Sequence, residues 1–498
     1  MATIAMAEND TRRQNFFHLL AKLFPPGKLY RILLIIFLFS LPLVNPIVHG
    51  DGVGYYAYAR APLIQHNFHF ENDWQHANLN FSRSRTRSDG QLLPDEYTET
   101  GYVSNLFTVG PALLWLPFLF LAHVFVLLLD LFGTHIPADG FSLPYIIAMA
   151  FGTAVYGFLG LLLSFALAKK YLAERWALLA TVSIWWASSL PVYMYFNPAW
   201  SHAHSAFAVA LFVWYWDRTH NTRSTRQWLL LGLVAGLMVN IYFPNSIFLL
   251  LPLVESLLIY YKDFKSEPSE LLSLFGQNLL FILAICFTFL PTIITRRIIF
   301  GGFFRFGSYS HLSWDWSAPH WRAVLVSSDH GLFSWTPLLA FALLGLFFVP
   351  RASRRLAIYF GVAFLAFYYL ISSYPFWDGM SSFGNRFFIS LTPIYVFGLA
   401  ALLQRFESLF SSTRFALLVY LAVLTCFVFW NLGFVYEWGA HMIPVRGPIS
   451  FRTVVHNQFY EVPHQLSVHF RDYFFHRSDL MRNIEQQDIE QLNKSSAQ

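Results

Sequence analysis

Long apolar runs separated by short polar loops constrain this chain more than any other feature of its sequence. The first run, LYRILLIIFLFSLPLVNPIV, covers residues 29–48. A helix of about 20 apolar residues is long enough to cross the hydrocarbon core of a bilayer. Charged residues make up 12% of the chain, which is about half of the fraction in soluble proteins. We therefore expect an all-α, polytopic integral membrane protein.

The basic loops between the runs set the expected topology, because Lys and Arg are enriched in cytoplasmic loops. Residues 106–133 are also apolar, but they contain Pro111 and Pro117, and we expect this run to pack obliquely instead of crossing fully. The total is then about 11 to 12 transmembrane helices. After the first span, further spans are expected near residues 143–168, 176–195, 200–216, 228–243, 245–261, 274–294, 332–349, 356–373, 386–403 and 414–434.

Two long polar segments complete the expected organisation. Residues 49–105 follow the first span and form a large external loop, and residues 435–498 form an external C-terminal tail. Residues 1–434 then make up one transmembrane domain, with the basic residues 1–28 in the cytoplasm. The net charge of +5 comes mostly from Lys and Arg in short loops, so it indicates orientation in the membrane and not nucleic-acid binding.

One acid stands directly after the first span, in the stretch HGDGVGYYAYARAPL (residues 49–63). Asp51 lies between two glycines, which allow the backbone to approach a ligand closely, and Tyr55 and Tyr56 follow it. A carboxylate held at a membrane surface can serve as a general base. The alternative is an interfacial acid that only ends a helix.

Two histidines, His202 and His204, stand in the stretch NPAWSHAHSAF. Residues two apart diverge on a helix and share a face on an extended segment. A metal-binding pair on one helix face is more often spaced by three or four residues. We therefore favour substrate hydrogen bonding over metal ligation, and the alternative is a pair of ordinary loop histidines.

Cations and aromatic residues alternate in two later external loops. The loop 295–331 contains Arg305 and His330, and the stretch YPFWDGMSSFGNRFFISLTP contains Trp377 and Asp378. That stretch also places Arg386 at the entrance of a span, where an unpaired charge is costly. An Arg fork can bind a phosphate with two hydrogen bonds. These loops predict a phosphorylated lipid ligand, and the alternative is an interfacial loop with snorkelling Arg side chains.

Three stretches taken together resemble the GT-C superfamily of membrane glycosyltransferases: HGDGVGYYAYARAPL, SSDHGLFSWTPLL and WDGMSSFGNRFFISLTP. Within that superfamily, the stretches resemble those of bacterial members related to protein O-mannosyltransferases and of the aminoarabinose lipid A transferases. The resemblance implies an inverting transferase with a polyprenyl-phosphate sugar as donor. The reaction would take place at the outer face of the bacterial cytoplasmic (inner) membrane. The acceptor stays open between a protein, a lipid A-like molecule and a growing glycan.

The resemblance also implies roles for single residues. Asp51 matches the acid of the family's first external loop and is expected to be the catalytic base or a metal contact, and Arg386 is expected to contact the donor phosphate. We expect Arg305 and His330 to join Arg386 at the phosphate. The residues expected to line the substrate are Tyr55, Tyr56, His202, His204, Trp377 and Asp378.

The chain departs from the family at one position. Many relatives carry two acids one residue apart in this loop, whereas position 53 is Val53. Glu71 or Asp73 is a candidate for the second acid. A divalent cation at Asp51 is therefore an open question.

Two other classes of function compete with a transferase. A flippase or other transporter of lipid-linked glycans needs a polar path with charged residues at mid-depth, and the expected spans carry almost none. A non-catalytic membrane scaffold would tolerate replacement of Asp51 and Arg386. No P-loop or dinucleotide-binding motif is present in the sequence, which argues against ATP-driven transport and dinucleotide chemistry.

Overall fold

The computed structural model of the chain divides into two compact units, Met1–Pro42 and Leu43–Gln498. It describes residues 27–496 except 79–80, 83, 88, 221–222, 264–267, 306 and 308–311. The expectation that residues 1–28 lie in the cytoplasm therefore concerns a segment almost entirely outside the described residues.

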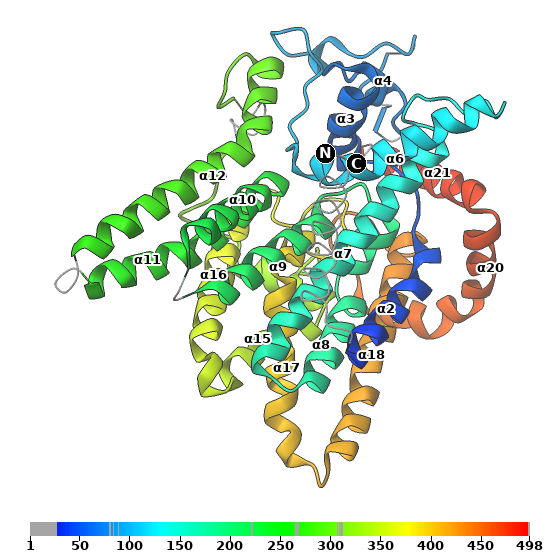
Figure 1. Cartoon of the computed structure of the whole chain (residues 1–498). Helices are drawn as coiled ribbons and strands as arrows, with labels where there is room; N and C mark the ends of the chain where they lie inside the picture. The colour runs from blue at the N-terminus through cyan, green and yellow to red at the C-terminus, as the bar shows by residue number, and fades with distance from the viewer. Residues whose placement is uncertain are drawn as a thin grey trace. The chain divides into compact units, whose positions relative to one another are not determined.

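The described residues form helices and loops (Figure 1), with two isolated β-bridges, Thr86–Leu92 and Tyr97–Val103, and no longer strand. Seven of the described helices are long and apolar enough to cross a membrane. The predicted all-α, polytopic class is confirmed, whereas the total of 11 to 12 spans stays a prediction. The seven segments are Gly110–Leu131, Leu143–Tyr171, Phe243–Lys262, Leu271–Phe300, Arg351–Ser372, Arg386–Leu409 and Thr413–Gly439.

The first unit contains helix α2 (Lys28–Ser40), which is followed by the 3₁₀ turn η1 (Leu41–Leu43). α2 has 13 residues, fewer than the about 20 that a straight helix needs to cross a bilayer. The predicted span 29–48 is therefore only partly helical. Pro42 and Pro46 lie at its end, and proline disfavours continuation of a helix.

The second unit opens with the large loop. α3 (Asp51–Arg60) continues into the π-helical turn η2 (Ala61–Gln65), and α4 (Glu71–Gln75) and η3 (Pro94–Glu96) follow. The next helix, α6 (Gly110–Leu131), runs on through Pro117 and has the length and composition of a span. Whether residues 106–133 cross or pack obliquely stays a prediction.

The core of the second unit is made by α7 (Leu143–Tyr171), α9 (His202–Thr219) and α17 (Thr392–Phe406), which pack against one another. Small residues let helices approach closely in membrane proteins. α15 (Leu338–Gly345) contacts α17 in this way, because a Cβ at Gly345 would overlap the backbone of Gly398. Most residues of the segment containing α17 are buried, whereas most residues of the apolar segments in α12 and α18 are not.

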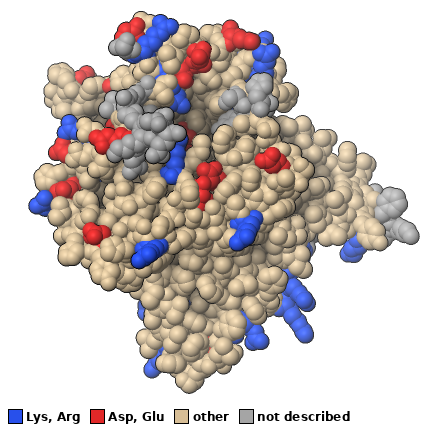
Figure 2. All heavy atoms as spheres, turned by 180° about the vertical axis from the view of Figure 1, so that it is seen from behind, with Lys and Arg blue, Asp and Glu red and all other residues tan. Residues whose placement is uncertain are grey.

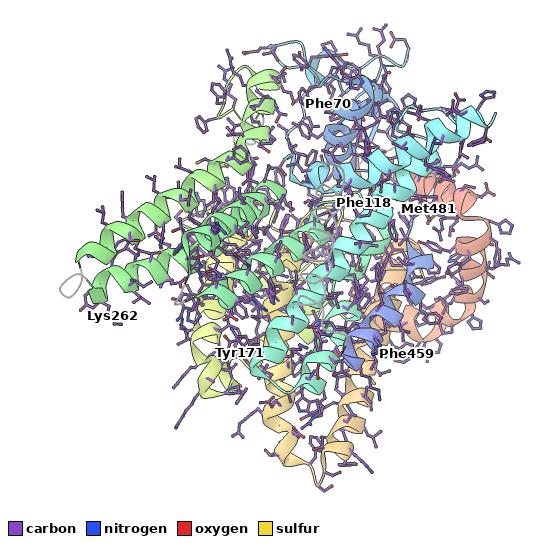
Figure 3. All side chains as sticks on the ribbon, in the orientation of Figure 1. Phe70, Phe118, Tyr171, Lys262, Phe459 and Met481 are labelled. Carbon is purple, nitrogen blue, oxygen red and sulfur yellow. The ribbon has the colours of Figure 1, made fainter. Side chains whose placement is uncertain are left out.

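A second group of helices lies beside this core. α10 (Thr225–Ile241) packs along α12 (Pro268–Phe300), where Gly232 and Gly236 admit the partner backbone. α11 (Leu250–Asp263) contacts α12 as well, and Lys262 marks the end of α11 in Figure 3. Lys, Arg, Asp and Glu are sparse over much of the face shown in Figure 2, as expected for a surface that contacts lipid.

The C-terminal tail is helical and returns to the beginning of the second unit. Tyr473 Oη donates to the carbonyl of Leu43 at 2.6 Å, and Arg477 Nη1 donates to the carbonyl of Val44 at 2.6 Å. The tail thereby anchors the segment that leads to Asp51. Its elements are the end of α18 (Thr413–Gly439), α19 (Phe451–His456), η11 (Asn457–Glu461), α20 (Val462–Phe475) and α21 (Arg477–Ser496).

The remaining helices connect these parts. They are α8 (Glu174–Trp186), η4 (Val192–Phe196), η5 (Phe243–Leu249), α13 (Trp321–Val326), α14 (Leu332–Trp335), η7 (Leu346–Phe348), η8 (Arg351–Ser353), α16 (Arg354–Ser372), η9 (Arg386–Leu391) and η10 (Glu407–Leu409).

Candidate functional site

An ion pair between Asp51 and Arg386 forms the centre of the candidate site. Asp51 is the first residue of α3, and Arg386 is the first residue of η9, which leads into α17. Arg386 Nη1 donates to Asp51 Oδ2 at 2.8 Å across 335 residues of sequence. The Arg386 side chain is 7% exposed and that of Asp51 is 34% exposed. The pair therefore joins a buried cation to an acid that solvent and ligands can reach.

The two glycines around Asp51 explain how α3 meets the stretch that precedes α9. Gly50 has a positive φ of 54°, and a Cβ there would lie 3.0 Å from the indole of Trp200. A Cβ at Gly52 would lie 2.5 Å from that of Ala199. Side chains at either position would push Asp51 away from this stretch. The close contact therefore fixes the start of α3 beside Trp200.

Trp200 in turn covers Arg386. The indole Nε1 donates to the carbonyl of His49 at 3.0 Å, and the ring lies 4.2 Å from the guanidinium carbon of Arg386. The ring of Phe387 lies 5.6 Å from the same carbon. A guanidinium on aromatic faces is held by cation–π attraction and keeps its N–H groups available at the edges. Sequence reasoning did not single out Trp200, although it stands two residues before His202.

His202 and His204 diverge, as expected for residues two apart on a helix. His202 lies among the rings of Tyr193, Tyr242 and Phe387, at centroid distances of 4.9, 5.7 and 6.4 Å. Its Nδ1 is buried without a hydrogen-bond partner. His204 faces Trp115, at a centroid distance of 5.0 Å. His202 therefore belongs to the wall around Arg386, whereas His204 packs against α6.

A second polar group adjoins Arg386. His330 is fully buried, and its Nδ1 lies 3.0 Å from the carbonyl oxygen of Asp378 and 3.6 Å from Asp329 Oδ1. One ligand atom from each of these three residues lies within 4.8 Å of the other two. Gly379 follows Asp378, and a Cβ there would lie 3.4 Å from Arg386 Nε. The three residues therefore form a cluster next to the ion pair.

Burial dominates the protonation behaviour of this cluster. It lowers the pKa of His330 to about 4, and the positive charge of Arg386 lowers it further, while the hydrogen bond to the Asp378 carbonyl works in the opposite direction. Burial also raises the pKa of Asp329, and the negative charge of Asp378 adds to that increase. The imidazole is therefore neutral at physiological pH and can offer a lone pair.

Tyr55 and Tyr56 lie on different sides of α3. Tyr55 accepts a hydrogen bond from Ser201 at 3.1 Å and packs on Phe107, so it lies against the stretch that carries Trp200. Tyr56 donates from its hydroxyl to the carbonyl of Gly140 at 2.6 Å. Burial raises the pKa of Tyr56 far above its ordinary value. Tyr56 thus serves the packing of α3 and not the surroundings of Arg386.

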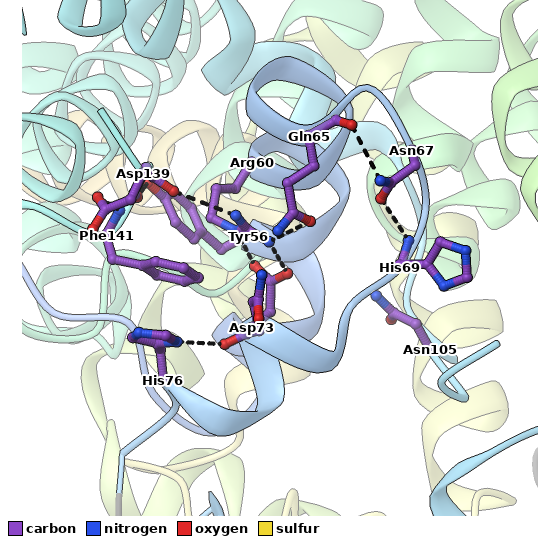
Figure 4. Close-up of polar contacts among 12 residues, drawn as sticks. Tyr56, Arg60, Gln65, Asn67, His69, Asp73, His76, Asn105, Asp139 and Phe141 are labelled. Atoms are coloured by element: carbon purple, nitrogen blue, oxygen red, sulfur yellow. Dashed lines mark hydrogen bonds and ion pairs between the residues drawn. The ribbon is translucent and has the colours of Figure 1, made fainter. Parts of the chain in front are cut away.

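Asp73 is bound to Arg60 at the opposite end of α3 (Figure 4). Arg60 donates to both carboxylate oxygens, at 2.6 and 2.5 Å, and both side chains are 2% exposed. Burial raises the pKa of Asp73, and the Arg60 hydrogen bonds lower it in part. Arg60 lies nine residues after Asp51, which is about 13 Å along a helix. The structure thus holds Asp73 away from Asp51.

Glu71 faces His69 at 3.5 Å and is partly exposed. Among the described residues, the group of acids and histidine with metal-binding spacing does not include Asp51. A metal at Asp51 with Glu71 as the second acid therefore stays a prediction.

Arg305 and Trp377 have partners of their own. Arg305 is 64% exposed and pairs with Glu99 at 3.3 Å. The carbonyl of Trp377 accepts a hydrogen bond from Asn385 at 2.9 Å, which braces the loop that ends at Arg386. Among the described contacts, Arg305 has none with Arg386, so the structure does not bring it to the ion pair.

Fold and helix composition define a multi-pass, all-α membrane protein. A scan against protein-family models finds no match, and neither does a search of curated proteins. Among solved structures, the chain is similar to ArnT from Cupriavidus metallidurans in the apo state, with 13% identity and a TM-score of 0.43 over 82% of this chain and 70% of ArnT. It is similar also to the same protein bound to undecaprenyl phosphate, with 13% identity and a TM-score of 0.43 over 82% of this chain and 71% of ArnT.

Proposed function

We propose that the protein transfers a sugar from a polyprenyl-phosphate donor to an acceptor hydroxyl, with inversion, at the outer face of the bacterial cytoplasmic membrane. One observation carries the proposal. The three stretches that resemble GT-C enzymes are far apart in the sequence, and they contain Asp51, His330 and Arg386. In the fold, Asp51 contacts Arg386, and the cluster that contains His330 lies next to Arg386. This convergence is expected of an active site and is not needed for helix packing alone.

Arg386 has the properties of an anion anchor. Its Nη1 is engaged by Asp51, whereas its Nε is buried and has no hydrogen-bond partner among the described residues. A buried donor without a partner is costly, and a ligand oxygen would satisfy it. The guanidinium would thus bind the donor phosphate and stabilise the negative charge that develops on it as the sugar leaves.

Asp51 supplies the base. The acceptor hydroxyl attacks the anomeric carbon, the bond from that carbon to the phosphate oxygen breaks, and the hydroxyl proton passes to the Asp51 carboxylate. Polyprenyl phosphate leaves with the bonding electrons. A donor phosphate competes with Asp51 for Arg386, so donor binding would free the carboxylate for the acceptor.

The test is transfer by full-length protein purified in detergent, with polyprenyl-phosphate sugars as donors and total envelope extract as the source of acceptor. We expect Asp51→Asn to lower product formation about 10²–10⁴-fold while the protein still elutes as a folded species. Glu99→Gln, an exposed acid of the same loop, is the matched control and keeps full activity. Unchanged turnover in Asp51→Asn would remove Asp51 as the base. Movement of the lipid-linked sugar across vesicles without a covalent product would favour a flippase instead.

A further inference from the structure

We propose that Asp329, His330 and Asp378 bind one divalent transition-metal ion, Zn²⁺ or Mn²⁺, next to Arg386. Asp329 and His330 follow α13, and Asp378 belongs to the loop between α16 and η9. One ring nitrogen and one oxygen of each carboxylate lie within 4.8 Å of one another. Ligands of a tetrahedral metal lie about 3.4 Å apart at ordinary bond lengths. Rotation of these side chains would therefore be needed to close the cluster around an ion.

The histidine is arranged as metal-ligating histidines are. Its Nδ1 lies 3.0 Å from the Asp378 carbonyl oxygen, which can only accept, so Nδ1 carries the proton and Nε2 carries the lone pair. Nε2 is buried and has no hydrogen-bond partner in the described structure. A ligating histidine typically donates its other N–H to a carbonyl or carboxylate, which fixes the ring and its tautomer. The ring of Trp335 packs on His330 at 4.7 Å and limits its rotation.

The carboxylates give an independent indication. Asp329 Oδ1 is buried, has no hydrogen-bond partner, and lies 3.6 Å from His330 Nδ1, which is too far for a hydrogen bond. Asp378 brings a second negative charge close to it. Two nearby carboxylates and an uncompensated buried oxygen are costly without a cation. A metal ion would neutralise both acids and occupy the unpaired atoms.

The donor set indicates the class of metal. Carboxylate oxygens suit Mn²⁺ and Mg²⁺, whereas imidazole nitrogen suits Zn²⁺ and other transition metals. Mg²⁺ usually keeps several waters and binds through one or two carboxylates, so it needs no buried imidazole. Three protein ligands leave at least one position for water or a ligand oxygen, as in catalytic zinc sites.

The role of the ion rests on the proposed function, whereas its binding does not. Because Gly379 lies against Arg386, a metal held by the neighbouring Asp378 would lie close to the guanidinium. The ion would then share the charge of the departing phosphate with Arg386. This would place the positive charge of the site on Arg386 and the metal, without a second acid beside Asp51.

The test measures metal binding by the full-length protein after chelation and gel filtration. We expect the wild type to take up about one equivalent of Zn²⁺ or Mn²⁺, read by elemental analysis and calorimetry. His330→Gln, Asp329→Asn and Asp378→Asn should each weaken binding at least about tenfold. The matched control is the neighbouring exposed pair Asp315 and His320, 3.3 Å apart, where Asp315→Asn and His320→Gln leave uptake unchanged.

Spectra of the wild type keep the proposal testable if a variant fails to fold. Co²⁺ should give visible absorption typical of low coordination, and Mn²⁺ should give an electron paramagnetic resonance signal that Zn²⁺ displaces. No uptake by folded wild type, or uptake that survives all three substitutions, overturns the site. Metal binding without sugar transfer leaves this inference standing and counts against the proposed function. Full transfer by metal-free protein overturns the role given to the ion.

Discussion

Two Arg–Asp pairs lie at the two ends of α3. They differ in how many hydrogen bonds the Arg makes and in how exposed the Asp is. Arg60 donates two hydrogen bonds to Asp73. Its other N–H groups donate to Gln65 and to the Asp139 carbonyl, and its guanidinium stacks on Phe141. Arg386 touches Asp51 through one nitrogen, leaves Nε without a partner, and has a partly exposed acid. In the first pair, the Arg donors are engaged and both side chains are buried. In the second pair, one Arg donor and an accessible carboxylate are available to a ligand.

The largest effect is expected from breaking the saturated pair. Arg60→Ala leaves the Asp73 carboxylate buried without a cation, which costs about 3–5 kcal/mol of stability. Thermal unfolding in detergent and the yield of folded protein measure this loss. Arg60→Met combined with Asp73→Leu should recover most of it, because no charge is left buried. An Arg60→Ala protein as stable as wild type would contradict the assignment of this pair to structure.

The opposite pattern is expected at the other end of the helix. Asp51→Asn removes the base but keeps the volume of the side chain, so transfer should fall about 10²–10⁴-fold. The unfolding temperature should fall less than in Arg60→Ala, since Asp51 is 34% exposed and the introduced amide oxygen can still accept a hydrogen bond from Arg386. Rates and unfolding curves measured on one preparation separate the two effects. A strongly destabilised Asp51→Asn would make both pairs structural.

Arg386→Lys sharpens the comparison, because it keeps the charge and removes the planar fork. A lost charge-assisted hydrogen bond amounts to about 1.5–3 kcal/mol, so binding of undecaprenyl phosphate should weaken about 10- to 100-fold. Titration of the lipid against intrinsic tryptophan fluorescence follows the change, since Trp200 lies on the guanidinium. Equal affinity in Arg386→Lys and wild type would argue against a phosphate contact.

Gly52→Ala tests whether the close packing of α3 against Ala199 matters for the site. The added Cβ would meet that of Ala199 at 2.5 Å, and overpacking of this kind costs about 1–3 kcal/mol. We expect a modest loss of stability and a reduced transfer rate, because Asp51 is displaced from Arg386. Combining Gly52→Ala with Ala199→Gly should restore both. Failure of that combination would locate the strain elsewhere.

The smallest effect is expected at Glu71. Its contact with His69 is 3.5 Å long and involves a half-exposed ring, and exposed pairs contribute little. Glu71→Gln should change stability by less than about 0.5 kcal/mol and leave transfer unchanged. A large loss of transfer would return Glu71 to the role of a second acid.

The sequence predicted the fold class well because long apolar runs have few stable alternatives in a membrane. It also singled out Asp51 and Arg386, since a charge beside such runs is conspicuous. The structure brings these two side chains into contact, and their roles stay predictions. It did not predict that Asp73 is bound to Arg60, because the contact joins two helices of an irregular loop. The grouping of Asp329 with His330 and Asp378 was missed for a similar reason. Only packing of α13, α14 and the loop after α16 brings these residues together.

The anchoring of Leu43 by Tyr473 has a consequence for how the protein is made. The two residues are 430 positions apart, and at about 5–20 residues per second the ribosome needs roughly 20–90 s to cover that distance. The segment that leads to Asp51 therefore leaves the ribosome early. Its contact with Tyr473 can form only after residue 473 has been synthesised. The candidate active site would be among the last parts of the molecule to become rigid, after most of its membrane helices are in place.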